Sequence, residues 1–145
     1  MVTLEQFSYC PTHSTHPPFC YDFHYVKPGI VAIFGDNGSG KSTLAQLMAG
    51  WYPDFLPGEI TGTGTLLGTP IGHIPLNEQS ATIQLVQQSP YLQLSGCTFS
   101  VEEEVAFGPE NLCLAEEEIM ARIDAALTLT ECQPLRHRHP ATLSG

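Results

Sequence analysis

The sequence has few basic side chains: five Lys and Arg, against 15 Asp and Glu, which gives 145 residues a formal net charge of −10. Proteins that bind nucleic acid take much of their affinity from cations that displace phosphate counterions. The scarcity of Lys and Arg therefore argues against a nucleic-acid partner. Apolar runs are also short, and none approaches the roughly 20 residues that a membrane-spanning helix needs.

The sequence lacks a secretion signal and a disulfide framework. Its first residues have no basic stretch followed by an apolar core, and its five cysteines are odd in number and irregularly spaced. Both features favour reduced thiols in a cytosolic protein. Cys10, His13, His16 and Cys20 are all zinc-ligand types, but they are crowded into eleven residues, whereas structural zinc sites separate two short-spaced pairs by a longer element. A hairpin loop is the simpler interpretation. Residues 136–139, R-H-R-H, are likewise interpreted as a solvated loop and not as metal ligands.

The apolar pattern of the first half predicts several strands. Residues 2–9 alternate loosely, and 19–26 place four aromatic side chains at every second position, on one face. Residues 30–34 form a short β-branched run typical of a buried parallel strand. Residues 51–75, rich in Gly, Pro and Thr, indicate turns and short antiparallel strands, and 81–86 form another apolar strand candidate.

Three segments have helical spacing. One begins at Lys41 and stops at Gly50. A second is expected over 101–107, where Ser100 and Glu103 form a capping box. The third covers 115–130 and has three glutamates in its first turn, where the helix dipole favours anions. The predicted elements are thus a mixture of strands and helices, which is consistent with the α/β class.

Acidic residues are concentrated in the second half. Nine of the 15 lie between Glu102 and Glu131, against a single base, Arg122. Such a run is typical of a solvated helix face. The alternative is an electrostatically marked docking surface.

Residues 35–42, G-D-N-G-S-G-K-S, match the phosphate-binding pattern G-x-x-x-x-G-K-[ST]. The glycines let successive N–H groups converge on an anion-sized hollow, and the following helix adds the positive end of its dipole. Lys41 is expected to reach the β- and γ-phosphates, and the Ser42 hydroxyl to ligate Mg²⁺. This local field allows a nucleoside triphosphate site in an acidic protein.

Beyond this motif, the chain resembles the ATP-binding-cassette (ABC) ATPases, and within them the energy-coupling-factor and cobalt-type importer subunits. The segments that carry the resemblance are 35–44 (Walker A), 58–62 (entry to an antiparallel subdomain), 86–93 (V-Q-Q-S-P-Y-L-Q, Q-loop), 101–112 (start of a helical subdomain) and 143–145 (L-S-G, start of the LSGGQ signature). Their order and spacing fit the family over nearly the whole chain.

The resemblance implies a P-loop NTPase fold of the ABC type, with an N-terminal antiparallel β-subdomain, the start of a helical subdomain and an incomplete parallel core sheet. Within this partial domain, residues 1–80 would hold the antiparallel strands and the Walker A core. Residues 81–145 would hold the Q-loop and the helical subdomain. Because the pattern stops inside the signature, we expect the N-terminal portion of a longer protein, without the Walker B aspartate, catalytic glutamate and switch histidine.

The resemblance also assigns site residues. Gln88 and Lys41 would act in catalysis, with Gln88 contacting the attacking water, and Ser42 and Gln88 would ligate Mg²⁺. Leu143, Ser144 and Gly145 would contact the ATP of a partner subunit. The residues implied in ATP binding are Gly35, Asp36, Asn37, Gly38, Ser39, Gly40, Lys41, Ser42 and Thr43, with Tyr9 as the candidate for stacking on adenine.

The function implied is that of an ATP-binding subunit, peripheral on the cytoplasmic face of the cell membrane. The complete protein would bind ATP with Mg²⁺ and hydrolyse it to power uptake of a metal ion or vitamin, whereas residues 1–145 alone would bind without turnover. Implied partners are a second ABC ATPase subunit, a transmembrane coupling subunit and a substrate-binding membrane component. The alternatives are another P-loop NTPase and a soluble, non-transport ABC ATPase.

Overall fold

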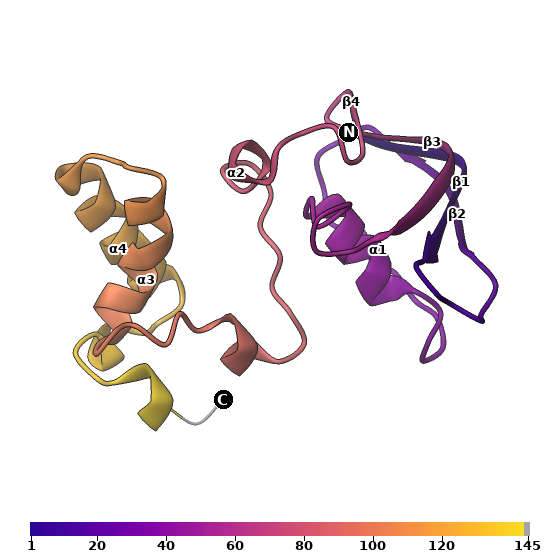
Figure 1. The fold of residues 1–145 in the computed structure, drawn as a ribbon. Helices are drawn as coiled ribbons and strands as arrows, with labels where there is room; N and C mark the ends of the chain where they lie inside the picture. The colour runs from indigo at the N-terminus through magenta and orange to yellow at the C-terminus, as the bar shows by residue number, and fades with distance from the viewer. Residues whose placement is uncertain (144–145) are drawn as a thin grey trace. The chain divides into compact units, whose positions relative to one another are not determined.

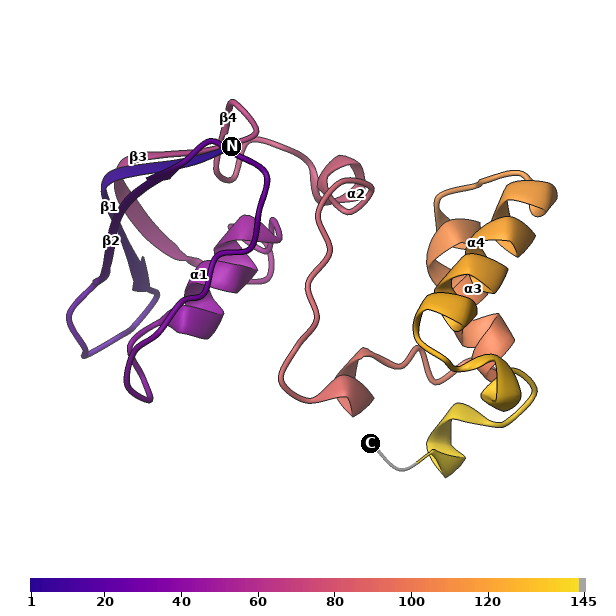
Figure 2. The same cartoon turned by 180° about the vertical axis from the view of Figure 1, so that it is seen from behind.

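The computed structural model describes residues 1–143, except for the side chain of Pro90, and divides the chain into two compact units, Met1–Leu85 and Val86–Gly145. Figures 1 and 2 show the units from opposite sides. The sequence suggested a division after residue 80. No helix within the described residues has the length and hydropathy needed to cross a bilayer.

The first unit is built on an antiparallel sheet with strand order β2-β1-β3-β4. Its strands are β1 (Val2–Pro11), β2 (Phe19–Tyr25), β3 (Gly58–Leu66) and β4 (Thr69–Pro70), and its helices are α1 (Lys41–Met48) and α2 (Leu76–Gln79). Helix α1 lies against the sheet (Figure 1). Its Leu44 and Leu47 pack with Leu4, Phe7 and Tyr9 of β1. The aromatic face of β2 borders the same core, as its period-two pattern predicts.

A β-bulge explains why the alternation along β1 is only loose. The register shifts between Leu4 and Phe7 in the pairing with β2 and between Glu5 and Ser8 in the pairing with β3, and Gln6 adopts a positive φ of 46°. Gly62 lies across from the bulge with φ 78°, and a Cβ there would overlap the Gln6 carbonyl. The extra residue returns Phe7 to the core side, so that Leu4 and Phe7 are both buried.

The segment between β1 and β2 forms the expected hairpin loop, and β1 and β2 pair in antiparallel register on either side of it. His13 lies in this loop with a positive φ of 61°. Within residues 1–143, no three His, Cys, Asp or Glu side chains gather closely enough to hold a metal ion.

The strand predicted over residues 30–34 does not form, which corrects the sequence interpretation. The segment has no strand assignment, and Ile30 and Phe34 are 101% and 89% exposed. The strand predicted over 81–86 is also absent from the described structure. A buried parallel strand needs neighbours on both sides, and the one sheet described in residues 1–143 is antiparallel. These residues therefore do not build the parallel core of the expected fold.

The second unit is a helical hairpin of α3 (Val101–Asn111) and α4 (Glu116–Leu129), joined through Ala106, Ile123 and Leu127. Three short 3₁₀ turns accompany the helices: η1 (Pro90–Gln93), η2 (Gln133–Leu135) and η3 (Pro140–Thr142). Helix α3 runs past residue 107, where the sequence predicts its end, and includes Pro109. The proline loses one backbone hydrogen bond, but it lies within the last turn and does not end the helix.

Candidate functional site

The Walker A loop, residues 35–42, joins the extended segment 30–34 to helix α1. Gly38 and Gly40 have φ values of 83° and 87°, in the region that favours glycine. The Ser39 amide donates to the Asp36 carbonyl at 3.2 Å, which closes the turn. Helix α1 begins at Lys41 and has no side-chain cap, since its N-cap is Gly40. Its first-turn amides are therefore left for an external anion.

Strand β2 holds the end of this loop in place. The Tyr21 hydroxyl donates to the Gly40 carbonyl at 2.8 Å, and burial raises the pKa of Tyr21 to about 12, so this hydroxyl stays a donor at neutral pH. A Cβ on Gly40 would lie 2.6 Å from both the Phe19 ring and the Tyr21 oxygen. The aromatic side chains of β2 therefore leave no room for a side chain at position 40.

The Lys41 side chain lies across the Walker A loop. Its Nζ donates to the carbonyls of Gly35 and Asp36, both at 2.7 Å, and lies 3.4 Å from the Ser39 Oγ. An ammonium group has three donors, and the third contact is long enough for that proton to turn toward an anion. The loop therefore holds the Lys41 ammonium against its own backbone and leaves one donor available to a phosphate.

Ser42 is the predicted Mg²⁺ ligand of the Walker A loop. It is exposed in the first turn of α1, and its hydroxyl makes no side-chain hydrogen bond in the part of the chain that the structure describes. Mg²⁺ is commonly held by one or two protein oxygens together with substrate phosphates and water. An exposed hydroxyl in the first turn of α1 has the chemistry for that role, which stays a prediction. Thr43, the next residue, is half-buried on the same turn.

The position of Tyr9 does not support adenine stacking. Its side chain is 0% exposed, and its hydroxyl donates to the Leu56 and Pro57 carbonyls at 3.2 and 2.9 Å. Its ring meets Tyr52 edge-on, with centroids 6.3 Å apart. Both polar and apolar parts of Tyr9 are thus used within the core, and no ring face is presented to a base.

Gln88 and the signature residues belong to the second unit. Gln88 is exposed in the loop that precedes η1, and its place relative to Ser42 and Lys41 stays a prediction. Leu143 follows η3 and is half-buried. The predicted contacts of Ser144 and Gly145 fall outside the described residues.

Much of the acidic run is engaged in internal bonds. The Glu104 carboxylate accepts from the Ser95 amide at 2.7 Å, the Ser95 hydroxyl at 2.8 Å and the Thr98 hydroxyl at 2.6 Å. Glu103 accepts from the Phe99 amide at 2.7 Å, and its own amide donates to the Ser100 hydroxyl, as the capping box predicts. These carboxylates hold the loop before α3 in place. Their internal bonds give them a role in the fold, so a docking surface is not needed to explain them.

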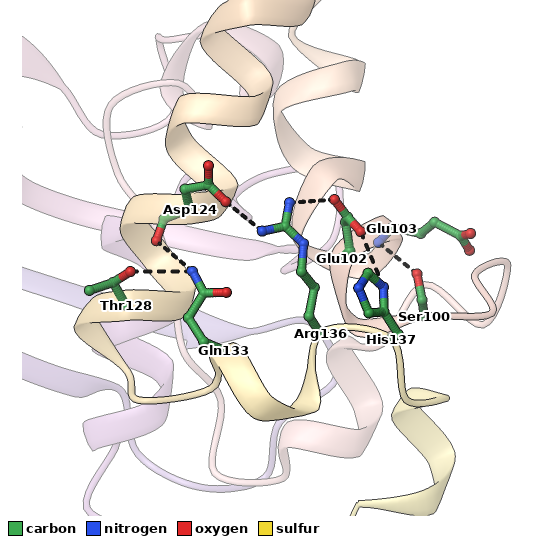
Figure 3. A network of polar contacts seen from close by, with 8 residues as sticks. All are labelled: Ser100, Glu102, Glu103, Asp124, Thr128, Gln133, Arg136 and His137. Atoms are coloured by element: carbon green, nitrogen blue, oxygen red, sulfur yellow. Dashed lines mark hydrogen bonds and ion pairs between the residues drawn. The ribbon is translucent and has the colours of Figure 1, made fainter.

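Arg136 is a residue that sequence reasoning missed. The sequence suggested a solvated loop at residues 136–139, but the Arg136 guanidinium lies between Glu102 of α3 and Asp124 of α4, at 2.5 Å from each (Figure 3). This bond to Arg136 lowers the pKa of Glu102. The two carboxylates lie on different helices, 22 residues apart in sequence, so no local pattern could have paired them with Arg136.

Acid is expected to loosen the loop that Glu104 holds. Burial pushes the pKa of Glu104 up, but its three hydrogen bonds outweigh burial and lower the pKa below its usual 4.5. Its stabilising contribution is therefore complete above about pH 4.5 and is lost as pH falls through the lower folded-state pKa. Replacing Glu104 by glutamine should cost about 1 kcal/mol of unfolding free energy at pH 7, measured from the helical circular dichroism signal in urea.

The matched control is Glu110→Gln, on the same helix. Glu110 is exposed and makes no side-chain bond among residues 1–143. The Glu104→Gln deficit should shrink toward pH 3, while Glu110→Gln follows the wild type throughout. A Glu104→Gln deficit that stays constant down to pH 3 would contradict the prediction.

Comparison with known proteins gives one family. Residues 21–145 match the profile of a family described as ABC transporter. A putative ABC transporter ATP-binding protein of Methanosarcina mazei is 38% identical over 146 residues, which covers 100% of this chain and 51% of the relative.

Two further relatives have more specific names. The energy-coupling factor transporter ATP-binding protein EcfA of Methanosarcina acetivorans is also 38% identical, again over 100% of this chain and 51% of the relative. A protein named EcfA1 in Levilactobacillus brevis is 41% identical over 79% of this chain and 39% of the relative. The chain thus spans about half the length, or less, of these curated relatives.

Proposed function

The chain belongs to the ABC transporter ATP-binding family, and on that premise we propose that the complete protein is the ATP-hydrolysing subunit of an importer of the energy-coupling-factor type. The observation that carries the proposal is the Walker A loop, where the Lys41 ammonium donates to the Gly35 and Asp36 carbonyls and α1 begins without a side-chain cap. The names of the Methanosarcina acetivorans and Levilactobacillus brevis relatives support the importer type. The cargo would be a metal ion or a vitamin.

In this proposal the first unit binds the triphosphate. The α1 amides and the Lys41 ammonium hold the phosphates, and Ser42 with Gln88 would hold Mg²⁺, which neutralises phosphate charge when bound. Gln88 would also orient the attacking water. Leu143 and the two residues after it would contact the ATP of a second ABC ATPase subunit, so that each nucleotide lies between two subunits.

Further partners follow from the same proposal. A transmembrane coupling subunit would hold the protein at the cytoplasmic face of the membrane, and a separate membrane component would select the cargo. Four acidic side chains between residues 102 and 131 are exposed and make no side-chain bond within residues 1–143, and these are the ones that a basic coupling helix could contact: Glu110, Glu116, Glu117 and Glu131. Charge reversal of Glu102 or Glu104 would be a poor test of docking, because both carboxylates support the fold.

The test is MgATP hydrolysis by the complete protein, with residues 1–145 measured beside it. We expect steady phosphate release from the complete protein and nucleotide binding without turnover from residues 1–145, since the catalytic base lies later in the family pattern. Gln88→Ala in the complete protein should lower kcat at least tenfold. Steady phosphate release by residues 1–145, abolished by Lys41→Ala, would contradict the expected lack of turnover in that segment, and absence of release from the complete protein would overturn the proposed function.

A second measurement separates an importer from a soluble ABC ATPase. The complete protein should co-purify with transmembrane proteins of its own cell and should release phosphate faster in that complex. An ATPase that stays monodisperse without membrane partners, and whose rate they do not change, would overturn the importer assignment while leaving the ATPase assignment in place.

A further inference from the structure

The loop that carries Gln88 is held by side chains more than by regular structure. Apart from the short turn η1, residues 86–100 form no helix or strand. The Gln87 amide donates to the Gln93 Oε1 at 2.7 Å. This hydrogen bond connects the two ends of the stretch that contains Gln88. The Glu104 carboxylate then fixes Ser95 and Thr98 farther along. The position of this loop therefore depends on a few identifiable bonds.

The segment that leads into the signature is fastened separately, to the start of α3. The Val101 amide donates to the Arg138 carbonyl at 2.9 Å, and the Glu102 amide donates to the Arg136 carbonyl at 3.0 Å. These carbonyls satisfy first-turn amides that would otherwise lack partners. Together with the Arg136 ion pairs (Figure 3), they make residues 136–138 an extension of the helical hairpin.

One hydrogen bond joins these two fastened segments. The Tyr91 hydroxyl, on η1 three residues after Gln88, donates to the Leu143 carbonyl at 2.8 Å. The two residues are 52 positions apart in sequence, and both belong to the second unit. Leu143 is also held from the other side, because its amide donates to the Pro140 carbonyl at 3.1 Å. The first signature residue is thus bonded both to the preceding turn and to the Gln88 loop.

We infer that Tyr91 is a positioning residue, whose hydroxyl couples the place of the Gln88 loop to that of the signature segment. The inference rests on the proposed function, which gives Gln88 a role beside one nucleotide and the signature a role beside another. A shift of the Gln88 loop would pull on the Leu143 carbonyl through this bond. The bond would then help to align the two sites of one subunit for turnover.

The first test is amide hydrogen exchange in the complete protein. Tyr91→Phe removes the hydroxyl and keeps the ring, so exchange should rise about two- to tenfold in residues 87–93 and 140–143 but not in α1. Tyr25→Phe is the control, because the structure describes no hydrogen bond from the Tyr25 hydroxyl within residues 1–143. Unchanged exchange in Tyr91→Phe, or an equal rise throughout the protein, would overturn the inference.

The second test uses kinetics and a donor-restoring variant. Tyr91→Phe should lower kcat about two- to tenfold, with KM for ATP unchanged, because no described contact of the Walker A loop involves Tyr91. Tyr91→4-aminophenylalanine keeps a donor on the ring and should recover the wild-type rate. Raised exchange without a change in kcat, or a lower kcat that the amino variant does not recover, would overturn the positioning role. If the wild-type protein did not hydrolyse ATP, the proposed function would fail. Amide hydrogen exchange would then be the measurement that decides whether Tyr91 couples the two segments.

Discussion

Replacing Lys41 by alanine is expected to weaken ATP binding by about tenfold to a hundredfold, the range of a lost hydrogen bond to a charged group. In the structure, two donors of the Lys41 ammonium hold it over the Gly35 and Asp36 carbonyls. The charge is therefore fixed at the loop, and little ordering is left to be done when phosphate binds. Titration calorimetry with ATP and Mg²⁺ on the complete protein would measure the loss directly.

Lys27→Ala is the matched control, because Lys27 is the other lysine of the chain and is exposed in the turn after β2. It changes net charge by the same amount, so any difference between the variants reports position and not overall electrostatics. ATP affinity should be nearly unchanged in Lys27→Ala, and both variants should keep the wild-type unfolding midpoint. Equal affinity losses in the two variants would contradict the Walker A assignment of Lys41.

Replacing Gly40 by alanine is expected to cost at least about 2 kcal/mol of unfolding free energy and to weaken nucleotide binding. Two effects add here: the backbone strain of a side chain at φ 87°, and the overlap of the new Cβ with Phe19 and the Tyr21 oxygen, both 2.6 Å away. Relief of that overlap must move either β2 or the Walker A loop. Chemical unfolding and ATP titration of the same preparation would measure both losses.

Gly68→Ala is the control that separates the cost of backbone strain from the cost of overlap with neighbouring atoms. Gly68 has nearly the same φ, 89°, but a Cβ there would meet nothing within 4 Å. This variant should cost only the strain, about 1 kcal/mol, and should leave ATP affinity unchanged because the β3–β4 turn is not part of the Walker A loop. Equal costs in the two variants would show that the aromatic face of β2 does not constrain position 40.

Local patterns in the sequence predicted the elements that depend on local chemistry. The α3 start follows from the Ser100 and Glu103 capping box, and the inward face of β2 follows from its period-two aromatics. The strand predictions for the apolar runs 30–34 and 81–86 were wrong, because a local pattern does not show whether neighbouring strands exist. A parallel strand exists only when distant segments supply its neighbours, and residues 1–143 supply none.

Some site properties depend on residues far apart in the chain. The family resemblance made Tyr9 a stacking candidate, but contacts with Tyr52, Leu56 and Pro57 bury it. The solvated loop expected at 136–139 contains an arginine that joins two helices. The resemblance to the signature likewise gave no indication that Tyr91 would bond to Leu143.

The sequence by itself determined the Walker A loop and the helix after it, because the glycines, Lys41 and Ser42 act within one continuous turn of backbone. It also determined the family, since several motifs occur in the right order. Only the tertiary structure decided why position 40 must be glycine, since Phe19 and Tyr21 reach it from another strand. Burial and cross-chain hydrogen bonds depend on which distant residues meet, and the linear order of the chain does not contain that information.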